Sequence, residues 1–193
     1  REAWARIVDC TNRIINSADP TVAREQDAFT TVMQATGEVY QIHAATFADR
    51  KANPRDDFMT ALVQAQIDGA PLSDMDLFSW ALILTTAGHE TTQSTFAMGI
   101  HTLLQHPEQL AMLREDPSLL PRAIDELLRY LSPAIHFTRT AARDVEFRGK
   151  AIKAGDKLAM LYPSANRDEE MFESPERLDI TRSPNRHVAF GTG

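Results

Sequence analysis

Cysteine is nearly absent from this chain of 193 residues, and Cys10 is the only one. A single cysteine excludes a disulfide framework and any metal site built from several thiolates. Runs of lysine or arginine are also missing, and the formal net charge is −7. That charge argues against a nucleic-acid-binding protein, because such proteins present clusters of basic residues to the phosphates.

The sequence also lacks an apolar run that could cross a membrane. The uncharged stretch from Leu77 to Gly88 falls short of the roughly 18 apolar residues that a spanning helix needs. There is no secretory signal peptide, internal repeat or low-complexity tract, so we expect a globular, cytoplasmic protein. The chain starts inside a helical pattern without a methionine and stops at Gly193. We therefore expect a fragment of a longer protein.

The chain as far as Pro133 follows helical periodicity, with breaks at proline and asparagine. The expected helices cover residues 1–17, 21–51, 56–67, 73–105, a short segment from 107, and 117–131. Short strands are then expected at 145–147, 151–153 and 158–162. The stretch from 163 to 193 reads as irregular. The pattern predicts a mainly α fold with a small β region.

The helix expected at 73–105 organises the rest. Ser73 and Asp76 are a plausible N-cap and an acidic first turn. From Leu77 to Gly88 there is no charge, and apolar residues cover every face of the helix. A helix that is apolar all round is typical of the middle of a protein.

The hexamer Ala87-Gly88-His89-Glu90-Thr91-Thr92 breaks that apolar pattern. A glycine within a helix costs about 1 kcal/mol relative to alanine, but lets a ligand approach the backbone. A threonine hydroxyl can bond back to a carbonyl one turn earlier, and a buried glutamate can relay protons. The alternative is a helix-packing glycine followed by ordinary polar residues. A zincin-type metal site is excluded, because Gln93 stands where H-E-x-x-H needs its second histidine.

A second motif, Glu126-x-x-Arg129, places a carboxylate and a guanidinium on one helix face. An exposed pair of this kind is the alternative, and it contributes under about 1 kcal/mol. Arg177, in the segment Phe172–Leu178, is a candidate third member, and Arg182 competes with it.

Together these pieces resemble the cytochrome P-450 family, the haem-thiolate monooxygenases. The resemblance extends from Pro54 onward and rests on four motifs in the family's order. They are the hexamer, Glu126-x-x-Arg129, the stretch from Ser164-Ala-Asn-Arg-Asp168 to Arg177, and Phe190-Gly-Thr-Gly193. The sequence looks most like soluble bacterial members that hydroxylate terpenoids such as terpineol, with sterol-oxidising members next.

The resemblance also indicates what is missing. In the family, Phe-Gly-x-Gly is followed by x-His-x-Cys, whose thiolate is the axial ligand of the haem iron, and Gly193 precedes that cysteine. Cys10 lies in a distal-side helix and cannot replace it. Residues 1–193 would form a partial P-450 domain, the central-to-proximal portion. We expect it to be inactive alone, and no metal ligand is assigned within it.

The resemblance implies roles for individual residues. Glu90 and Thr91 would deliver protons to dioxygen at the haem, and Ala87 and Gly88 would leave room for it. The haem (haem b) would be held at its propionates by Arg139 and His187, and Phe190 and Gly191 would lie against the porphyrin. The alternatives for Arg139 and His187 are a surface strand arginine and a loop histidine. The third group, Glu126, Arg129 and Arg177, would form a buried structural triad.

The substrate would meet uncharged residues, namely Ile83 and Thr86 on the helix and Ile135 and Phe137 at a strand entry. A neutral, hydrophobic substrate follows, because nothing there would hold a carboxylate. From Arg129 to Lys157 there are seven Lys/Arg against three Asp/Glu. This stretch could dock an acidic ferredoxin, fed by a reductase that uses NAD(P)H. An ordinary solvated hairpin is the alternative.

Two other readings compete with the monooxygenase. The first is a non-catalytic helical binding module, a relic of the fold without haem, although such a relic would have no use for Glu90 and Thr91. The second is a hydrolase that uses His89 and Thr91. It lacks a credible arrangement of base and orienting group.

Overall fold

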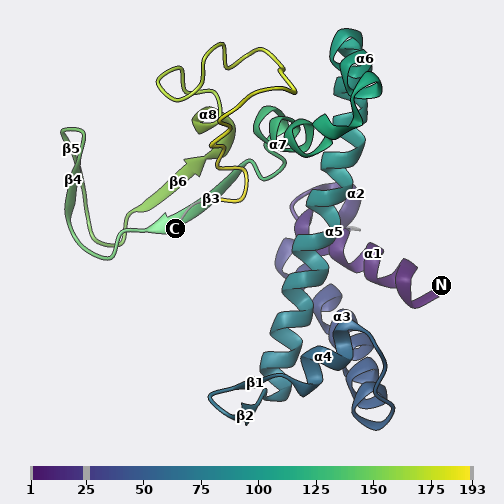
Figure 1. The fold of residues 1–193 in the computed structure, drawn as a ribbon. Helices are drawn as coiled ribbons and strands as arrows, with labels where there is room; N and C mark the ends of the chain where they lie inside the picture. Colours follow the sequence, from purple (N-terminus) through teal and green to yellow (C-terminus); the bar gives the residue numbers. More distant parts are fainter. Residues whose placement is uncertain (1, 24–26, 192–193) are drawn as a thin grey trace. The chain divides into compact units, whose positions relative to one another are not determined.

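The computed structural model describes residues 2–23 and 27–191 of the chain (Figure 1). The chain divides into two compact units, residues 1–92 and 93–193. One helix, α5 (Asp74–Gln105), begins in the first unit and ends in the second. Its predicted range, 73–105, is confirmed, and Ser73 is its cap. The Ser73 hydroxyl accepts from the Asp76 amide, and the Asp76 carboxylate accepts from the Ser73 amide and hydroxyl.

The described residues of the first unit form helices and one small hairpin. Its elements before α5 are α1 (Glu2–Ile15), α2 (Pro20–Ala23), α3 (Ala28–Ala52), α4 (Phe58–Gln64), β1 (Gln66–Ile67) and β2 (Ala70–Pro71). The single helix predicted at 21–51 is wrong, because Asp27 has extended backbone angles and its side chain accepts from the amide of Thr30 to begin α3.

The helix predicted at 56–67 is also wrong beyond Gln64. Asp68 and Gly69 have φ angles of 51° and 79° and turn the chain into the β1–β2 hairpin. Two successive residues with positive φ form the kind of turn that matches the twist of a two-stranded ribbon.

The core of the first unit lies along one side of α5. Phe47 and Leu62 pack with Leu77 and Ala81, and a second cluster joins Cys10 to Ala35 and Val39. Other apolar side chains of α5 stay exposed, including Trp80 at 51% and Ile83 at 56%. The prediction that α5 is buried on all sides is therefore wrong for this chain, where the neighbouring helices cover the side of α5 that carries Leu77, Phe78, Ala81 and Leu82.

After α5, the described residues of the second unit form three short helices, four strands and a long irregular tail. Its elements after α5 are α6 (Pro107–Glu115), the 3₁₀ turn η1 (Pro117–Leu119), α7 (Leu120–Leu131), β3 (His136–Thr140), β4 (Val145–Phe147), β5 (Lys150–Ile152), β6 (Lys157–Leu161) and α8 (Tyr162–Ala165). Strands β3 and β6 pair antiparallel, from His136 opposite Leu161 to Thr140 opposite Lys157, and β4 pairs with β5. The predicted mainly α class with a small β region is confirmed.

The irregular tail after α8 contributes to the core of this unit. Leu178 and Ile180 are 1% and 0% exposed and pack with Leu103, Ala123 and Leu127. The tail has no regular backbone ladder, so side chains of α6 and α7 supply many of its hydrogen-bond partners. These hydrogen bonds account for the polar cluster around Glu126 and Arg129.

Candidate functional site

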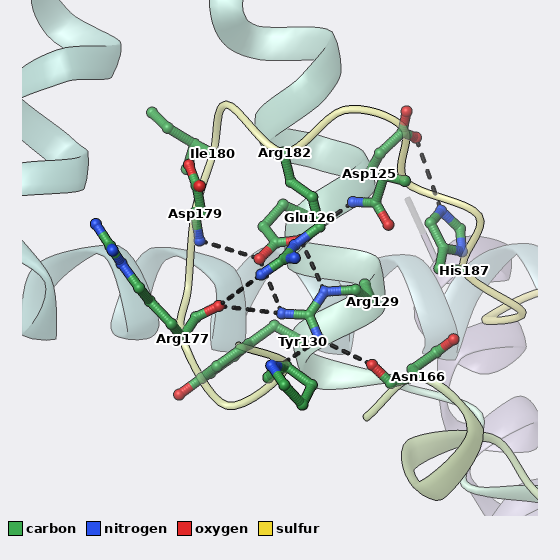
Figure 2. Close-up of polar contacts among 12 residues, drawn as sticks. Asp125, Glu126, Arg129, Tyr130, Asn166, Arg177, Asp179, Ile180, Arg182 and His187 are labelled. Atoms are coloured by element: carbon green, nitrogen blue, oxygen red, sulfur yellow. Dashed lines mark hydrogen bonds and ion pairs between the residues drawn. The ribbon is translucent and has the colours of Figure 1, made fainter. Parts of the chain in front are cut away.

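A buried ion pair lies at the centre of the second unit. Glu126 and Arg129 of α7 both have fully buried side chains, and the carboxylate accepts two hydrogen bonds, from Nε at 2.8 Å and from Nη2 at 2.9 Å. The remaining N–H groups of Arg129 donate to backbone carbonyls of Asn166 and Pro175, at 2.8 Å each, and of Arg177, at 3.2 Å. Figure 2 shows this arrangement, in which every donor of the guanidinium is used.

The predicted buried pair is confirmed, but its third member is not Arg177. Nε of Arg182 lies 3.0 Å from Oε2 of Glu126, whereas the side chain of Arg177 is exposed and only its carbonyl joins the cluster (Figure 2). The Asp179 amide also donates to Glu126, at 3.0 Å. The carboxylate is thus fully compensated, as a buried charge must be.

Two buried amide side chains hold the tail to the helices, and sequence reasoning assigned a role to neither. Gln109 of α6 accepts a hydrogen bond from the amide of Ile180 at 3.0 Å. Asn166 donates to the Ser132 hydroxyl and accepts from the amide of Val188, each at 2.8 Å. Asn166 stands in the string Ser164–Asp168 that carried the family resemblance, and that string was the available signal.

The loop His187–Gly191 carries three predicted cofactor residues. His187 is mostly buried and its Nε2 lies 3.8 Å from the carboxylate of Asp125, while Phe190 is 81% exposed. Gly191 has a φ of 76°, and a Cβ there would come within 2.9 Å of the Tyr162 hydroxyl. Glycine at this position therefore answers both a backbone and a steric requirement.

Strand β3 and its entry carry the other predicted residues of this unit. Ile135 and Phe137 are 64% and 55% exposed, and the ring of Phe137 lies 5.9 Å from that of Tyr162. The guanidinium of Arg139 is exposed and donates a long hydrogen bond of 3.4 Å to the carbonyl of Thr138. Among the described residues no carboxylate pairs with Arg139, so this cation is available to an anionic group.

The hexamer on α5 lies in the first unit. The Thr91 hydroxyl donates to the carbonyl of Ala87 at 2.6 Å, which confirms the predicted bond to the preceding turn, and the Thr86 hydroxyl does the same to Leu82. Within the described part of the chain the carboxylate of Glu90 has no hydrogen-bond partner. A Cβ added at Gly88 would meet nothing within 4 Å. This turn of α5 therefore combines an open glycine, an unengaged acid and an oriented alcohol, with Glu90 on a different side of the helix from Gly88 and Thr91.

His89 contacts residues of α1 and not Thr91. Its Nδ1 lies 3.4 Å from the hydroxyl of Thr11 on α1, and its ring meets Trp4 edge to face. The Thr91 proton is directed to the Ala87 carbonyl rather than to a base. This geometry gives no support to nucleophilic catalysis by a His89–Thr91 pair.

A family model for cytochrome P450 matches residues 2–193. The chain belongs to the cytochrome P450 family. It is 46% identical over 145 residues to cytochrome P450-terp of a Pseudomonas species, covering 75% of this chain and 34% of that protein. It is 36% identical to linalool 8-monooxygenase of Pseudomonas putida, covering 100% of this chain and 47% of that protein. A steroid C26-monooxygenase of Mycobacterium tuberculosis is 42% identical, over 87% of this chain and 42% of its own length.

Solved P450 structures match the fold. A Mycobacterium marinum P450 in complex with pseudoionone has a TM-score of 0.88 at 37% identity, covering 98% of this chain and 46% of its own. P450BioI in complex with an acyl carrier protein carrying hexadec-9Z-enoic acid has a TM-score of 0.89 at 33% identity, with coverages of 100% and 49%. This P450 chain therefore spans less than half the length of these relatives. Across the described residues, no helix has the length and apolar character needed to span a membrane.

Complete P450s carry a haem with a thiolate ligand, and the described residues fit the periphery of such a group. Arg139 offers an unpaired guanidinium to a carboxylate, and Phe190 offers an exposed ring to an apolar plane. The single cysteine does not fit the ligand role. Cys10 is fully buried and its Sγ lies 3.7 Å from Glu38, and burial together with that carboxylate raises the pKa of the thiol. A thiol held in this way stays protonated and is a poor metal ligand.

Proposed function

We propose that this chain is the central-to-proximal portion of a haem-dependent monooxygenase that inserts one oxygen atom of O2 into a neutral, hydrophobic substrate. The other oxygen leaves as water, and two electrons come from NAD(P)H. The observation that carries the proposal is the turn of α5 where Gly88 is open, Glu90 is unengaged and the Thr91 hydroxyl is fixed on Ala87. Bound haem b supplies the redox-active iron.

The residues of the chain then have separate tasks. Glu90 moves protons toward the oxygen site, and Thr91 holds a hydroxyl there whose proton is directed to the Ala87 carbonyl. Ala87 has a small side chain and Gly88 has none, so they leave space beside the helix for dioxygen. Arg139 and His187 bind the haem carboxylates, while Phe190 and Gly191 lie against the ring. Glu126, Arg129 and Arg182 hold the tail that leads to that loop.

The proposed substrate is terpenoid- or sterol-like. Ile83, Thr86, Ile135 and Phe137 carry no charge, and the Thr86 hydroxyl is already engaged by Leu82, so these residues favour apolar contact over hydrogen bonding. Relatives named for linalool and for steroid oxidation support this class.

The proposed electron donor is an acidic ferredoxin reduced by its own reductase. Residues 136–157 carry six Lys/Arg and three Asp/Glu in a chain of net charge −7. Two of the three acids are engaged locally, since Asp144 pairs with Lys153 and Asp156 accepts from the Lys153 amide. The basic excess of this hairpin is therefore free to attract an acidic surface.

The test compares residues 1–193 with the protein expressed from its complete gene. Each is mixed with haemin, reduced, and exposed to carbon monoxide. We expect a thiolate-type difference band from the complete protein and none from residues 1–193, whose single cysteine is the buried Cys10. Terpineol and a charged terpenoid acid are then titrated into the complete protein. Only the neutral compound should shift the absorption spectrum of the haem. A complete protein that binds no haem would favour the non-catalytic binding module instead.

A further inference from the structure

Asn166 is a fully buried amide at the end of α8 that joins three segments of the second unit. Its Nδ2 donates to the hydroxyl of Ser132, the C-cap residue of α7, at 2.8 Å. Its Oδ1 accepts from the amide of Val188 at 2.8 Å. Its carbonyl accepts from Arg129 at 2.8 Å, a bond that Figure 2 shows. Asn166 thus links a helix end and the loop His187–Gly191 through its side chain, and the buried ion pair through its backbone carbonyl.

The chemistry at this position requires both a donor and an acceptor. The Ser132 hydroxyl gives its only proton to the carbonyl of Arg129 at 3.0 Å, so it can only accept from Asn166. The Val188 amide can only donate. Among the small side chains an amide meets both demands at once, whereas a carboxylate at Asn166 would lack the donor and an alanine would lack both groups.

Two anchors lie on either side of Phe190 in the loop, and the bond from Val188 to Asn166 is the first. The Gly191 amide donates to the carbonyl of Val188 at 2.8 Å and closes a turn, and Ala189 within it is 4% exposed. The second anchor is Gly191 itself, which lies so close to Tyr162 that it has no room for a side chain. Phe190, between the anchors, is 81% exposed. The turn is fixed at both ends and presents one aromatic ring outward.

We propose that Asn166 is a positioning residue for the haem site: its buried amide sets the loop His187–Gly191 on the C-cap of α7 and so determines where Phe190 meets the haem. The proposal rests on the proposed function for its link to haem. The tether itself rests on the contacts of Asn166 alone.

Gln109 provides a matched control in the same unit. It is also a buried amide, 4% exposed, and its Oε1 accepts from a tail amide, that of Ile180, at 3.0 Å. Its bond holds a different part of the tail. Replacing either amide by alanine removes a buried hydrogen bond, but only Asn166→Ala should release the loop that carries Phe190.

The experiment uses the complete protein and its Asn166→Ala and Gln109→Ala variants, compared at equal folded fraction. Peptide-resolved hydrogen exchange should speed up about tenfold or more over residues 187–191 in Asn166→Ala, and around Ile180 in Gln109→Ala. The share of reduced, carbon-monoxide-bound haem with the thiolate-type band should fall in Asn166→Ala and stay unchanged in Gln109→Ala. Unchanged exchange over 187–191 in Asn166→Ala, or an equal loss of the band in both variants, would overturn the proposal.

A second variant decides the matter if Asn166→Ala does not fold. Ser132→Gly removes the acceptor of Nδ2, and glycine suits the left-handed backbone at this position, where φ is 46°. Exchange over 187–191 should rise in this variant too, and unchanged exchange would overturn the tether. A wild-type protein without any thiolate-type band would overturn the proposed function, while exchange at Val188 would still decide the role of Asn166.

Discussion

Nε of Arg182 lies 3.0 Å from Oε2 of Glu126 and donates a hydrogen bond to it, across 56 residues of sequence. The same guanidinium donates to the carbonyls of Glu173, Ser174 and Arg177. It therefore connects two segments of the tail with each other and with α7. Arg182 therefore joins the Asp179 amide and the Asn185 side chain in linking the carboxylate of Glu126 to the irregular part of the chain.

Removing the guanidinium of Arg182 should lower the free energy of unfolding more than removing that of Arg177. We expect Arg182→Ala to lower the free energy of unfolding by about 2 to 3 kcal/mol, less than a fully broken buried pair because Glu126 keeps Arg129. Arg177→Ala should change it by less than about 0.5 kcal/mol, since its contribution is a backbone carbonyl. Glu126→Ala, which strands the buried Arg129, should cost about 3 to 5 kcal/mol. Urea unfolding of the complete protein measures all three, and equal losses at 177 and 182 would contradict the assignment.

The position of Arg182 shows which contacts of the buried cluster can be predicted from the sequence and which cannot. The spacing of Glu126 and Arg129 fixes a shared helix face, so that pair is predictable. The choice between Arg177 and Arg182 is not, because it depends on the path of a tail without periodicity. The β1–β2 hairpin had a signal in Asp68-Gly69, but the apolar residues before it also fit a helix. Asp27, too, was a readable cap.

The buried histidine His43 should make the first unit sensitive to acid. Its Nε2 lies 3.1 Å from the hydroxyl of Thr85, which donates its own proton to Ala81, so His43 is the neutral donor in this bond. Burial lowers the pKa of His43 below its usual 6.5. The unfolded chain therefore binds the proton first, and stability falls as the pH drops through 6.5 toward the folded pKa, at up to about 1.4 kcal/mol per pH unit.

The pH effect is measured by urea unfolding between pH 5 and 8 for the wild type, His43→Gln and, as an exposed control, His101→Gln. The stability advantage of the wild type over His43→Gln should shrink as the pH falls below 6.5. The difference between the wild type and His101→Gln should stay constant. A constant advantage of His43 across this range would show that it does not titrate as its burial requires.

Glycine substitutions separate steric from conformational effects. Gly191→Ala should destabilise the protein by about 2 kcal/mol or more, because the φ of 76° is strained for alanine and the new Cβ would meet the Tyr162 hydroxyl at 2.9 Å. Gly37→Ala, at an exposed position of helix α3 with open space around it, should stabilise by about 0.5 to 1 kcal/mol. Thermal unfolding of both variants gives the comparison. A neutral Gly191→Ala would mean that the loop has another way to pass Tyr162.

Charge reversal tests the proposed ferredoxin surface. The double variant Arg148→Glu, Lys150→Glu changes the exposed tip of the β4–β5 hairpin, and Arg114→Glu on α6 is the control. We expect the KM for an acidic ferredoxin to rise about tenfold in the double variant and to lose much of its salt dependence. Turnover with a small chemical reductant should not change. An equal effect of Arg114→Glu would indicate general charge repulsion rather than a docking surface.

The parallel measurement of NAD(P)H consumed, hydrogen peroxide released and hydroxylated product formed tests the central claim most directly. In Thr91→Ala the hydroxyl held on Ala87 is lost. Haem content and substrate affinity should be nearly unchanged, but most electrons should end in peroxide instead of product. Glu90→Gln should mainly slow turnover, because it removes the acid that supplies protons. Thr92→Ala, the adjacent hydroxyl about 100° around the helix, should stay coupled. Full coupling in Thr91→Ala would contradict the proton-delivery role on which the proposed monooxygenase mechanism depends.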